Sequence, residues 1–209
     1  MFFIGLDLSD PFARRKRPCT RAVLDPGLAC SFEEWDYDTR GCGILPARAG
    51  SSGGVLAVDG PQGLAGTPGQ SMRMCERELR TAGKSSYAFR PLGQPYAGFV
   101  RGSVELFYSL VHSGLFLLHG MNGSGRFGLI EVYPGSAWPV LSGGEPLEKK
   151  GALRGRRRRQ HLLLQRGLRF PSHCGPDRLP THDQLDAALV AYIGFLFWRG
   201  RTVSCGTEP

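Results

Sequence analysis

The chain has 209 residues and a formal net charge of +8 at pH 7. This length suits one domain, or one domain with an insertion, and is long enough to bury a core. The positive charge favours a polyanionic partner such as nucleic acid, although a basic balance alone is a weak signal. Six scattered cysteines without a Cys-x-x-Cys pair exclude the spacing of a zinc site and a compact disulfide framework.

The apolar segments predict a soluble, cytoplasmic protein with reduced thiols. Residues 1–8 lack a basic n-region and meet Asp7 too early for a secretory signal peptide. The longest apolar runs, over 104–118 and 187–198, are shorter than the roughly 20 residues that a membrane span needs. We therefore expect no membrane partner.

The first predicted strand covers residues 2–7, FFIGLD, a continuous apolar run that ends in Asp7. Such a run indicates a strand buried on both faces, with its carboxylate at the edge where open α/β sheets place ligands. The basic turn over 10–17 then forms a hairpin connection to a second strand near 20–24. Its four basic residues are either a solvated loop or a phosphate contact. Residues 31–35 predict the start of a short helix.

Residues 55–61, VLAVDGP, repeat the pattern of the N-terminus. An apolar run ends in Asp59, and Gly-Pro then turns the chain sharply. Two buried strands that both end in Asp at one edge of a sheet are two coinciding patterns, which indicate a functional site more strongly than one motif would.

The next segments are a basic helix and an irregular insertion. Residues 71–80, SMRMCERELR, predict a helix that carries Arg73, Arg77 and Arg80. The insertion is expected at about 82–128, with an apolar, mainly helical segment over 102–118 that breaks near Ser113.

A third strand is expected over residues 129–134, LIEVYP, with Glu131 inside it. Alternation places Glu131 on one face with Tyr133. A lone Glu in a strand is most often solvent-facing, but this is the third acid on a predicted buried strand.

Residues 146–165 predict a basic helix with an apolar side of leucines. The arginine run is typical of a nucleic-acid-binding face, and a solvated helix explains it equally well.

The closing helix is predicted over 181–198, with Thr181 as N-cap. Its apolar residues recur at helical spacing and few are polar, so the helix is expected to be mostly buried. Asp183 and Asp186 are three residues apart and project from one face. At ~4 Å two carboxylates repel by roughly 4 kcal/mol at an effective dielectric of 20. A cation would offset this repulsion, and water would do so if the pair only caps the helix.

The order of GLDLS, VLAVDGPQG, MRMCERELR, IEVYPG, a basic helix and THDQLDAAL resembles the uncharacterised DUF429 family of predicted nucleases. That family is placed among RNase H-like, RuvC-resolvase-type folds. The resemblance extends over roughly residues 3–206, and the number and order of its short motifs make it specific. It implies one α/β, RNase H-like domain over 1–209, with a mixed central sheet and helices on both faces. Glu76 departs from the pattern, because the family usually has Asp there.

Individual residues match the family's motifs. Asp7 matches the first-strand aspartate, Asp59 the acid of the D-G-P motif, and Glu131 that of the E-x-Y-P motif. Asp183 and Asp186 resemble the two carboxylates that the closing helix of RuvC-type resolvases supplies to a metal site.

The resemblance implies a two-metal nuclease that hydrolyses phosphodiester bonds with Mg²⁺ or Mn²⁺, the ions about 3.5–4 Å apart. Hard cations prefer oxygen ligands. The metal ligands would be Asp7, Asp59, Asp183 and Asp186. Glu131 would be a further ligand or an acid that lies next to the ligands without touching the metal. The residues expected to hold the phosphate backbone of DNA or RNA are Arg73, Arg77, Arg80, Lys150, Arg154, Arg157 and Arg158.

Two alternatives remain open. Actin-like and sugar-kinase-like phosphotransferases share this fold and bind Mg-nucleotide at the same strand ends, but their second phosphate-binding glycine-rich hairpin is not visible. A non-catalytic nucleic-acid-binding protein is the other. Fold analogy alone is a weak guide to function.

Overall fold

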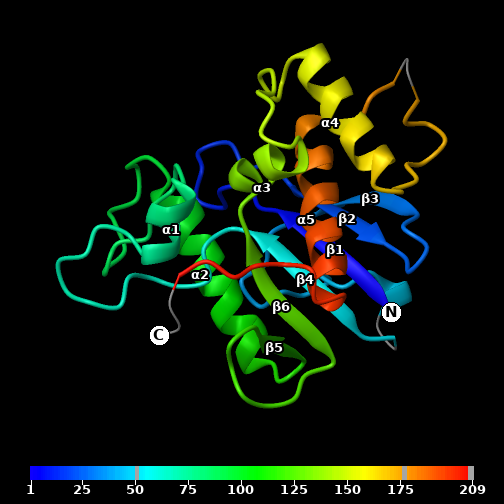
Figure 1. Ribbon diagram of the computed structural model, residues 1–209. Coiled ribbons are helices and arrows are strands. Elements are labelled where there is room, and N and C mark those ends of the chain that lie inside the picture. The colour runs from blue at the N-terminus through cyan, green and yellow to red at the C-terminus, as the bar shows by residue number, and fades with distance from the viewer. Residues whose placement is uncertain (50–51, 176–177, 207–209) are drawn as a thin grey trace.

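The computed structural model describes residues 1–49, 52–175 and 178–206 (Figure 1). The single domain predicted over 1–209 also includes residues 50–51, 176–177 and 207–209, which lie outside the described residues. Within the described chain, six strands form one mixed sheet of order β3-β2-β1-β4-β6-β5. The strands are β1 (Phe2–Asp7), β2 (Cys19–Leu24), β3 (Cys30–Trp35), β4 (Gly54–Asp59), β5 (Phe116–Leu118) and β6 (Phe127–Val132).

Helices cover both faces of this sheet. They are α1 (Met74–Leu79), α2 (Ala97–His112), α3 (Pro134–Leu141), α4 (Leu153–Gln165) and α5 (His182–Trp198), with a short 3₁₀ turn η1 (Ala47–Ala49). Figure 1 shows α5 across one face, with α3 and α4 beside it, and α2 behind the sheet. The predicted mixed α/β sheet with helices on both faces is confirmed.

The sheet is parallel except for β2, which runs antiparallel to β1 and β3. The carboxyl ends of β1 and β4 therefore meet at one edge, as their matching apolar runs predicted. The hairpin from β1 to β2 is also confirmed.

Helix α5 lies directly on β1 because neither backbone carries a bulky side chain at the crossing. A Cβ atom added at Gly5 would lie 2.1 Å from the Ala187 carbonyl oxygen and 2.3 Å from the Ala191 nitrogen. Ala187 and Ala191 are fully buried in the core on this face. The predicted burial of the helix is confirmed, and so is Thr181 as its N-cap, whose hydroxyl accepts a hydrogen bond from the Gln184 amide.

On the other face, the start of α2 supports the loops that leave the carboxyl edge. A Cβ atom at Gly98 would lie 2.2 Å from Asp10 Oδ1, so the loop after β1 contacts this helix closely. The Arg101 guanidinium lies over both the Phe12 ring, from the loop after β1, and the Phe89 ring, from the loop between α1 and α2. These contacts fix the two loops against one helix.

The short helix predicted over 31–35 is wrong, because these residues belong to β3. Turn hydrogen bonds between Asp25 and Leu28 reverse the chain, and β3 then pairs antiparallel with β2. Arg21 and Glu33 are direct cross-strand partners and form an ion pair. The cross-strand pairing outweighs the helix-like acidic sequence.

Three helix predictions need new boundaries. The helix expected over 71–80 is only α1, and that expected over 146–165 begins at Leu153, so Lys150 lies in an irregular segment. The apolar segment over 102–118 does break near Ser113, but α2 begins earlier, at Ala97, and strand β5 follows the break. The expected insertion at 82–128 thus contains α2, β5 and the start of β6.

No helix in the described ranges is long and apolar enough to cross a membrane.

We predict that Gly5→Ala destabilises the protein by about 3 kcal/mol or more, because its methyl group would overlap the α5 backbone. Urea unfolding would measure this change. Gly63→Ala is the matched control, because a Cβ atom there meets no atom within 4 Å. Its free energy of unfolding should change by less than about 0.5 kcal/mol. Equal stability of the two variants would contradict the close contact between α5 and β1.

Candidate functional site

The predicted acids of β1 and β4 lie side by side. Asp7 and Asp59 are register partners at the carboxyl ends of these parallel strands. They follow Phe3 and Val55 at even spacing, and those two residues belong to the core beneath α5. Since side chains alternate along a strand, both carboxylates project towards α5.

Helix α5 brings Asp186 to this pair. Asp186 is 3% exposed and directly precedes Ala187, the residue that contacts Gly5 of β1. Trp138 of α3 donates from its indole nitrogen to Asp186 Oδ1 over 2.6 Å, and Lys150 donates from Nζ to Oδ2 over 2.9 Å. Both carboxylate oxygens of Asp186 therefore have defined partners.

Burial and neighbouring charges disfavour the ionised forms of Asp7 and Asp59. Burial, followed by the charges of Asp59, Asp186 and Asp183, raises the pKa of Asp7 well above its ordinary value. Burial, followed by the charge of Asp186, raises the pKa of Asp59 to about 7. The Lys150 ammonium opposes both shifts. The site thus concentrates negative charge that a cation would stabilise.

Asp183 lies at the edge of this group. Its side chain is partly exposed, and its Oδ1 lies 2.7 Å from His182 Nδ1. Its charge contributes to the raised pKa of Asp7, but Asp183 is not buried with the other acids. The helix cap is made by Thr181 and Gln184, so capping does not explain the buried Asp186.

Glu131 projects from the other face of the sheet. It pairs with Val58, while Asp59 pairs with Val132, so Glu131 is one position out of phase with Asp59. The Arg73 guanidinium donates to both Glu131 oxygens, over 2.7 and 2.5 Å, and the Gln62 amide donates to Oε2 over 2.9 Å. Its charge still contributes to the raised pKa of Asp59, after burial and Asp186. The structure thus places it behind the three clustered acids.

Arg73 is engaged by carboxylates and not open to solvent. Its side chain is 12% exposed and pairs with the buried Glu76 as well as with Glu131. Glu76 also accepts hydrogen bonds from the Ser85 amide. Phosphate binding by Arg73 would require these ion pairs to break. In the structure, Arg73 instead links α1 to β6 through Glu76 and Glu131.

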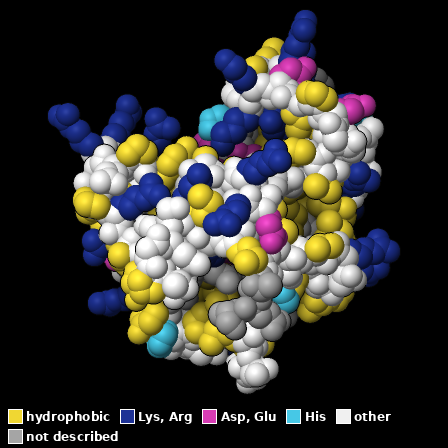
Figure 2. Space-filling model, turned by 60° about the vertical axis from the view of Figure 1, so that its left-hand side comes forward, with side chains coloured by type: hydrophobic (Ala, Val, Ile, Leu, Met, Phe, Trp, Pro, Cys, Tyr) yellow, Lys and Arg dark blue, Asp and Glu magenta, His cyan; other side chains and the backbone are white. Residues whose placement is uncertain are grey.

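The other residues predicted to contact phosphate differ in whether they are exposed or paired with a carboxylate. Arg77, Arg80, Arg154 and Arg157 are exposed. Arg158 pairs with Glu145, while Lys150 is bound to Asp186. Figure 2 shows Lys and Arg side chains on both sides of the hollow between the two upper parts of the molecule.

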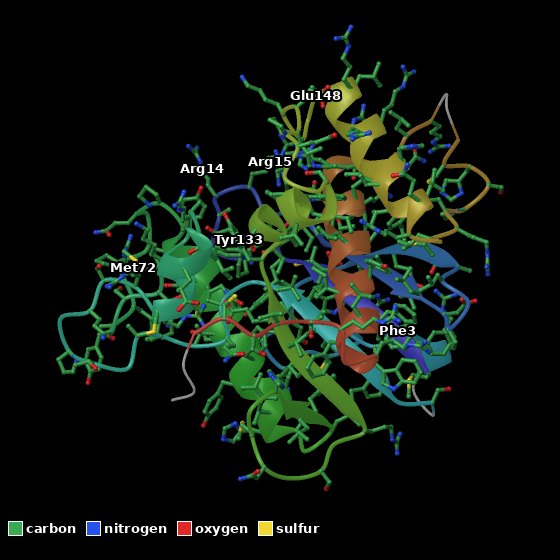
Figure 3. The ribbon with its side chains drawn as sticks, in the orientation of Figure 1. Phe3, Arg14, Arg15, Met72, Tyr133 and Glu148 are labelled. Carbon is green, nitrogen blue, oxygen red and sulfur yellow. The ribbon has the colours of Figure 1, made fainter. Side chains whose placement is uncertain are left out.

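A cleft of about 740 Å³ lies beside the acids. Its lining includes Asp59, Asp186 and Lys150, together with Tyr96 and Tyr133. Figure 3 shows Tyr133 at the start of α3, between that helix and the α1 segment, and shows Arg14 and Arg15 on the loop after β1. Tyr96 is 51% exposed and has a φ of 62°, which is costly for a residue with a side chain. The cleft therefore joins acidic, basic and aromatic groups.

Sequence reasoning missed Trp138 and Arg159. Trp138 orients Asp186, and the Arg159 guanidinium lies 5.4 Å from the Trp138 ring centroid. Helix α3 contains Pro139, and its first residue is Pro134. Pro at the first turn is a helix start signal that could have revealed this element.

The donor set fits a hard divalent cation. Asp7, Asp59 and Asp186 offer only oxygen ligands, and their negative charges are opposed by the Lys150 ammonium and, at Asp186, by the Arg159 guanidinium. In the arrangement described, with Lys150 against Asp186, no three His, Cys, Asp or Glu side chains of residues 1–49, 52–175 and 178–206 are grouped to hold a metal ion. Cation binding would therefore need side-chain rearrangement.

We predict that Arg73→Met destabilises the protein by about 3 kcal/mol, because it leaves the buried Glu76 and the partly buried Glu131 carboxylates without their partner. Chemical denaturation would measure the loss, and hydrogen exchange should locate it around α1. Arg77→Met, at an exposed position of the same helix, should change the stability by less than about 0.5 kcal/mol. Similar losses of stability in both variants would contradict the structural role of Arg73 as the link between α1 and β6.

We predict a pH-dependent gain in stability from Asp59→Asn, measured as thermal unfolding in EDTA. The folded protein holds the Asp59 proton up to a pKa of about 7, against 3.8 for the ordinary carboxyl. Asp59 thus contributes stability below pH 4 that is lost as the pH rises to about 7. The variant should exceed the wild type by on the order of 1 kcal/mol more at pH 8 than at pH 4. Asp36→Asn, at an exposed position, is the matched control. An Asp59→Asn effect that does not depend on pH would refute the raised pKa.

Comparison with known proteins adds the family. A family model described as "Protein of unknown function (DUF429)" matches residues 45–209, which includes Asp59, Glu131, Asp183 and Asp186 but not β1 with Asp7. Searches of curated proteins and of solved structures returned no significant match. The match extends over most of the sequence, and the chain therefore belongs to the DUF429 family.

Proposed function

We propose that this protein is a metal-dependent nuclease of the RNase H-like type, which hydrolyses phosphodiester bonds in nucleic acid. One observation carries the proposal: Asp7, Asp59 and Asp186 converge from two adjacent parallel strands and the closing helix. A buried acid cluster at the carboxyl edge of an α/β sheet is a typical place for a functional site. The mixed sheet with helices on both faces supports the RNase H-like assignment.

Asp7, Asp59 and Asp186 would hold Mg²⁺ or Mn²⁺, with Asp183 at the periphery. When bound, such ions activate a water nucleophile and stabilise the leaving oxygen. Trp138 holds one oxygen of Asp186 and so fixes the direction of the other. Glu131 and Arg73 hold β6 against α1, so they position the cleft wall.

The surroundings of the acids support a nucleic acid substrate. Exposed arginines of α1 and α4 provide charge for a phosphate backbone. Tyr96 presents an aromatic ring at the cleft, and aromatic rings stack on unpaired bases. The cytoplasmic location belongs to the same proposal, and six free thiols support it.

We predict that Asp7→Asn and Asp186→Asn each reduce cleavage by at least about 100-fold while nucleic acid binding persists. The assay uses single-stranded, double-stranded, branched and hybrid substrates with Mn²⁺ or Mg²⁺. Exposed Asp36→Asn is the control and should cleave like the wild type. Circular dichroism checks that each variant is folded.

Other outcomes identify the alternatives. ATP turnover that depends on Asp7, without nucleic acid cleavage, would replace the nuclease with a phosphotransferase. Binding without cleavage by the wild type on every substrate would favour a binding protein. Cleavage that survives in both Asn variants would contradict the proposed site.

A further inference from the structure

The Lys150 ammonium lies against the acid cluster. Its Nζ lies 2.9 Å from Asp186 Oδ2, and Asp7 and Asp183 also act on its charge. A single ammonium thus faces carboxylates of both β1 and α5.

The backbone around Lys150 is packed tightly, while more than half of its side chain is exposed. Residues 146–152 are irregular, but the Lys149 carbonyl accepts a hydrogen bond from the Ala152 amide. A Cβ atom at Gly155 would lie 2.2 Å from the same carbonyl, so the segment packs tightly against the start of α4. The Lys150 side chain, in contrast, is 56% exposed. Its ammonium can therefore leave the acids without a change in the fold.

Asp186 has one oxygen whose partner can be exchanged. Oδ1 accepts from Trp138, whose side chain is buried and cannot leave without opening the core. Oδ2 accepts from Lys150, whose side chain is 56% exposed. A metal ion that uses Oδ2 would compete with the Lys150 ammonium for that oxygen and would repel its charge.

We propose that Lys150 is an exchangeable counter-ion of the acid cluster, which a divalent cation displaces from Asp186. In the metal-free protein its positive charge compensates the carboxylates in part, together with the Arg159 guanidinium, which acts on Asp186. When a divalent cation binds, the ammonium turns into the cleft that Lys150 lines, where it is available to a substrate phosphate. This inference rests on the proposed function, because it takes Asp7, Asp59 and Asp186 as the cation site.

Calorimetric titration with Mn²⁺ at low ionic strength tests the exchange. Lys150→Gln and Lys150→Met remove the competing charge, so both should bind Mn²⁺ at least about threefold more tightly than the wild type. Lys149→Gln is the matched control, because it removes the same charge from the neighbouring, exposed residue. Its affinity should stay within twofold of the wild type. Equal or weaker binding by both Lys150 variants would overturn the inference.

Acetylation of lysine amines, read by mass spectrometry, gives a second test on the unmodified sequence. Mn²⁺ should raise the labelling of Lys150 relative to Lys149 at least about threefold, because the ammonium is released from Asp186. An unchanged ratio at saturating Mn²⁺ would overturn the exchange.

The two proposals fail in different ways. If Asp186→Asn abolishes Mn²⁺ binding but the Lys150 variants bind Mn²⁺ like the wild type, the metal site is supported and the Lys150 exchange is contradicted. If neither the wild type nor the Lys150 variants bind Mn²⁺ at millimolar concentration, both fall.

Discussion

The contact between two backbones, at Gly5 of β1 and at Ala187 and Ala191 of α5, determines the geometry of the acidic site. It places the helix so close to the strand that no Cβ atom fits between them. Asp7 lies two residues after Gly5, and Asp186 lies immediately before Ala187, so the contact also sets how close these carboxylates come. The fold therefore brings like charges together, and the Lys150 ammonium and the Arg159 guanidinium oppose them.

Much of this arrangement could be predicted from local sequence. Apolar runs that end in Asp7 and Asp59 predicted two buried strands with their carboxylates at one edge of the sheet, and Thr181 identified the start of α5. The side of the sheet on which Glu131 lies could not be predicted in the same way. Strands buried on both faces have no polar alternation, so the sequence did not reveal that Glu131 is out of phase with Asp59.

The remaining differences come from non-local contacts. The acidic segment of β3 looks helical until Arg21 of β2 is placed opposite Glu33. Lys150 was predicted to contact phosphate as part of a helix, but it lies before α4 and is bound to Asp186, 36 positions later. Trp138 went unnoticed because nothing in its neighbourhood marks an indole that will meet a carboxylate on another helix. Side chains brought together by the fold leave no mark in sequence spacing.

The stacking of Phe12 and Phe89 on Arg101 has a consequence for how the cleft can change shape. One loop follows Asp7, while the other leads from α1 to Tyr96 on the cleft wall. Because both loops rest on one guanidinium, displacement of either would disturb the other. A movement of the loop after Asp7 would therefore be transmitted through Arg101 to the segment that carries Tyr96, one of the residues that line the cleft.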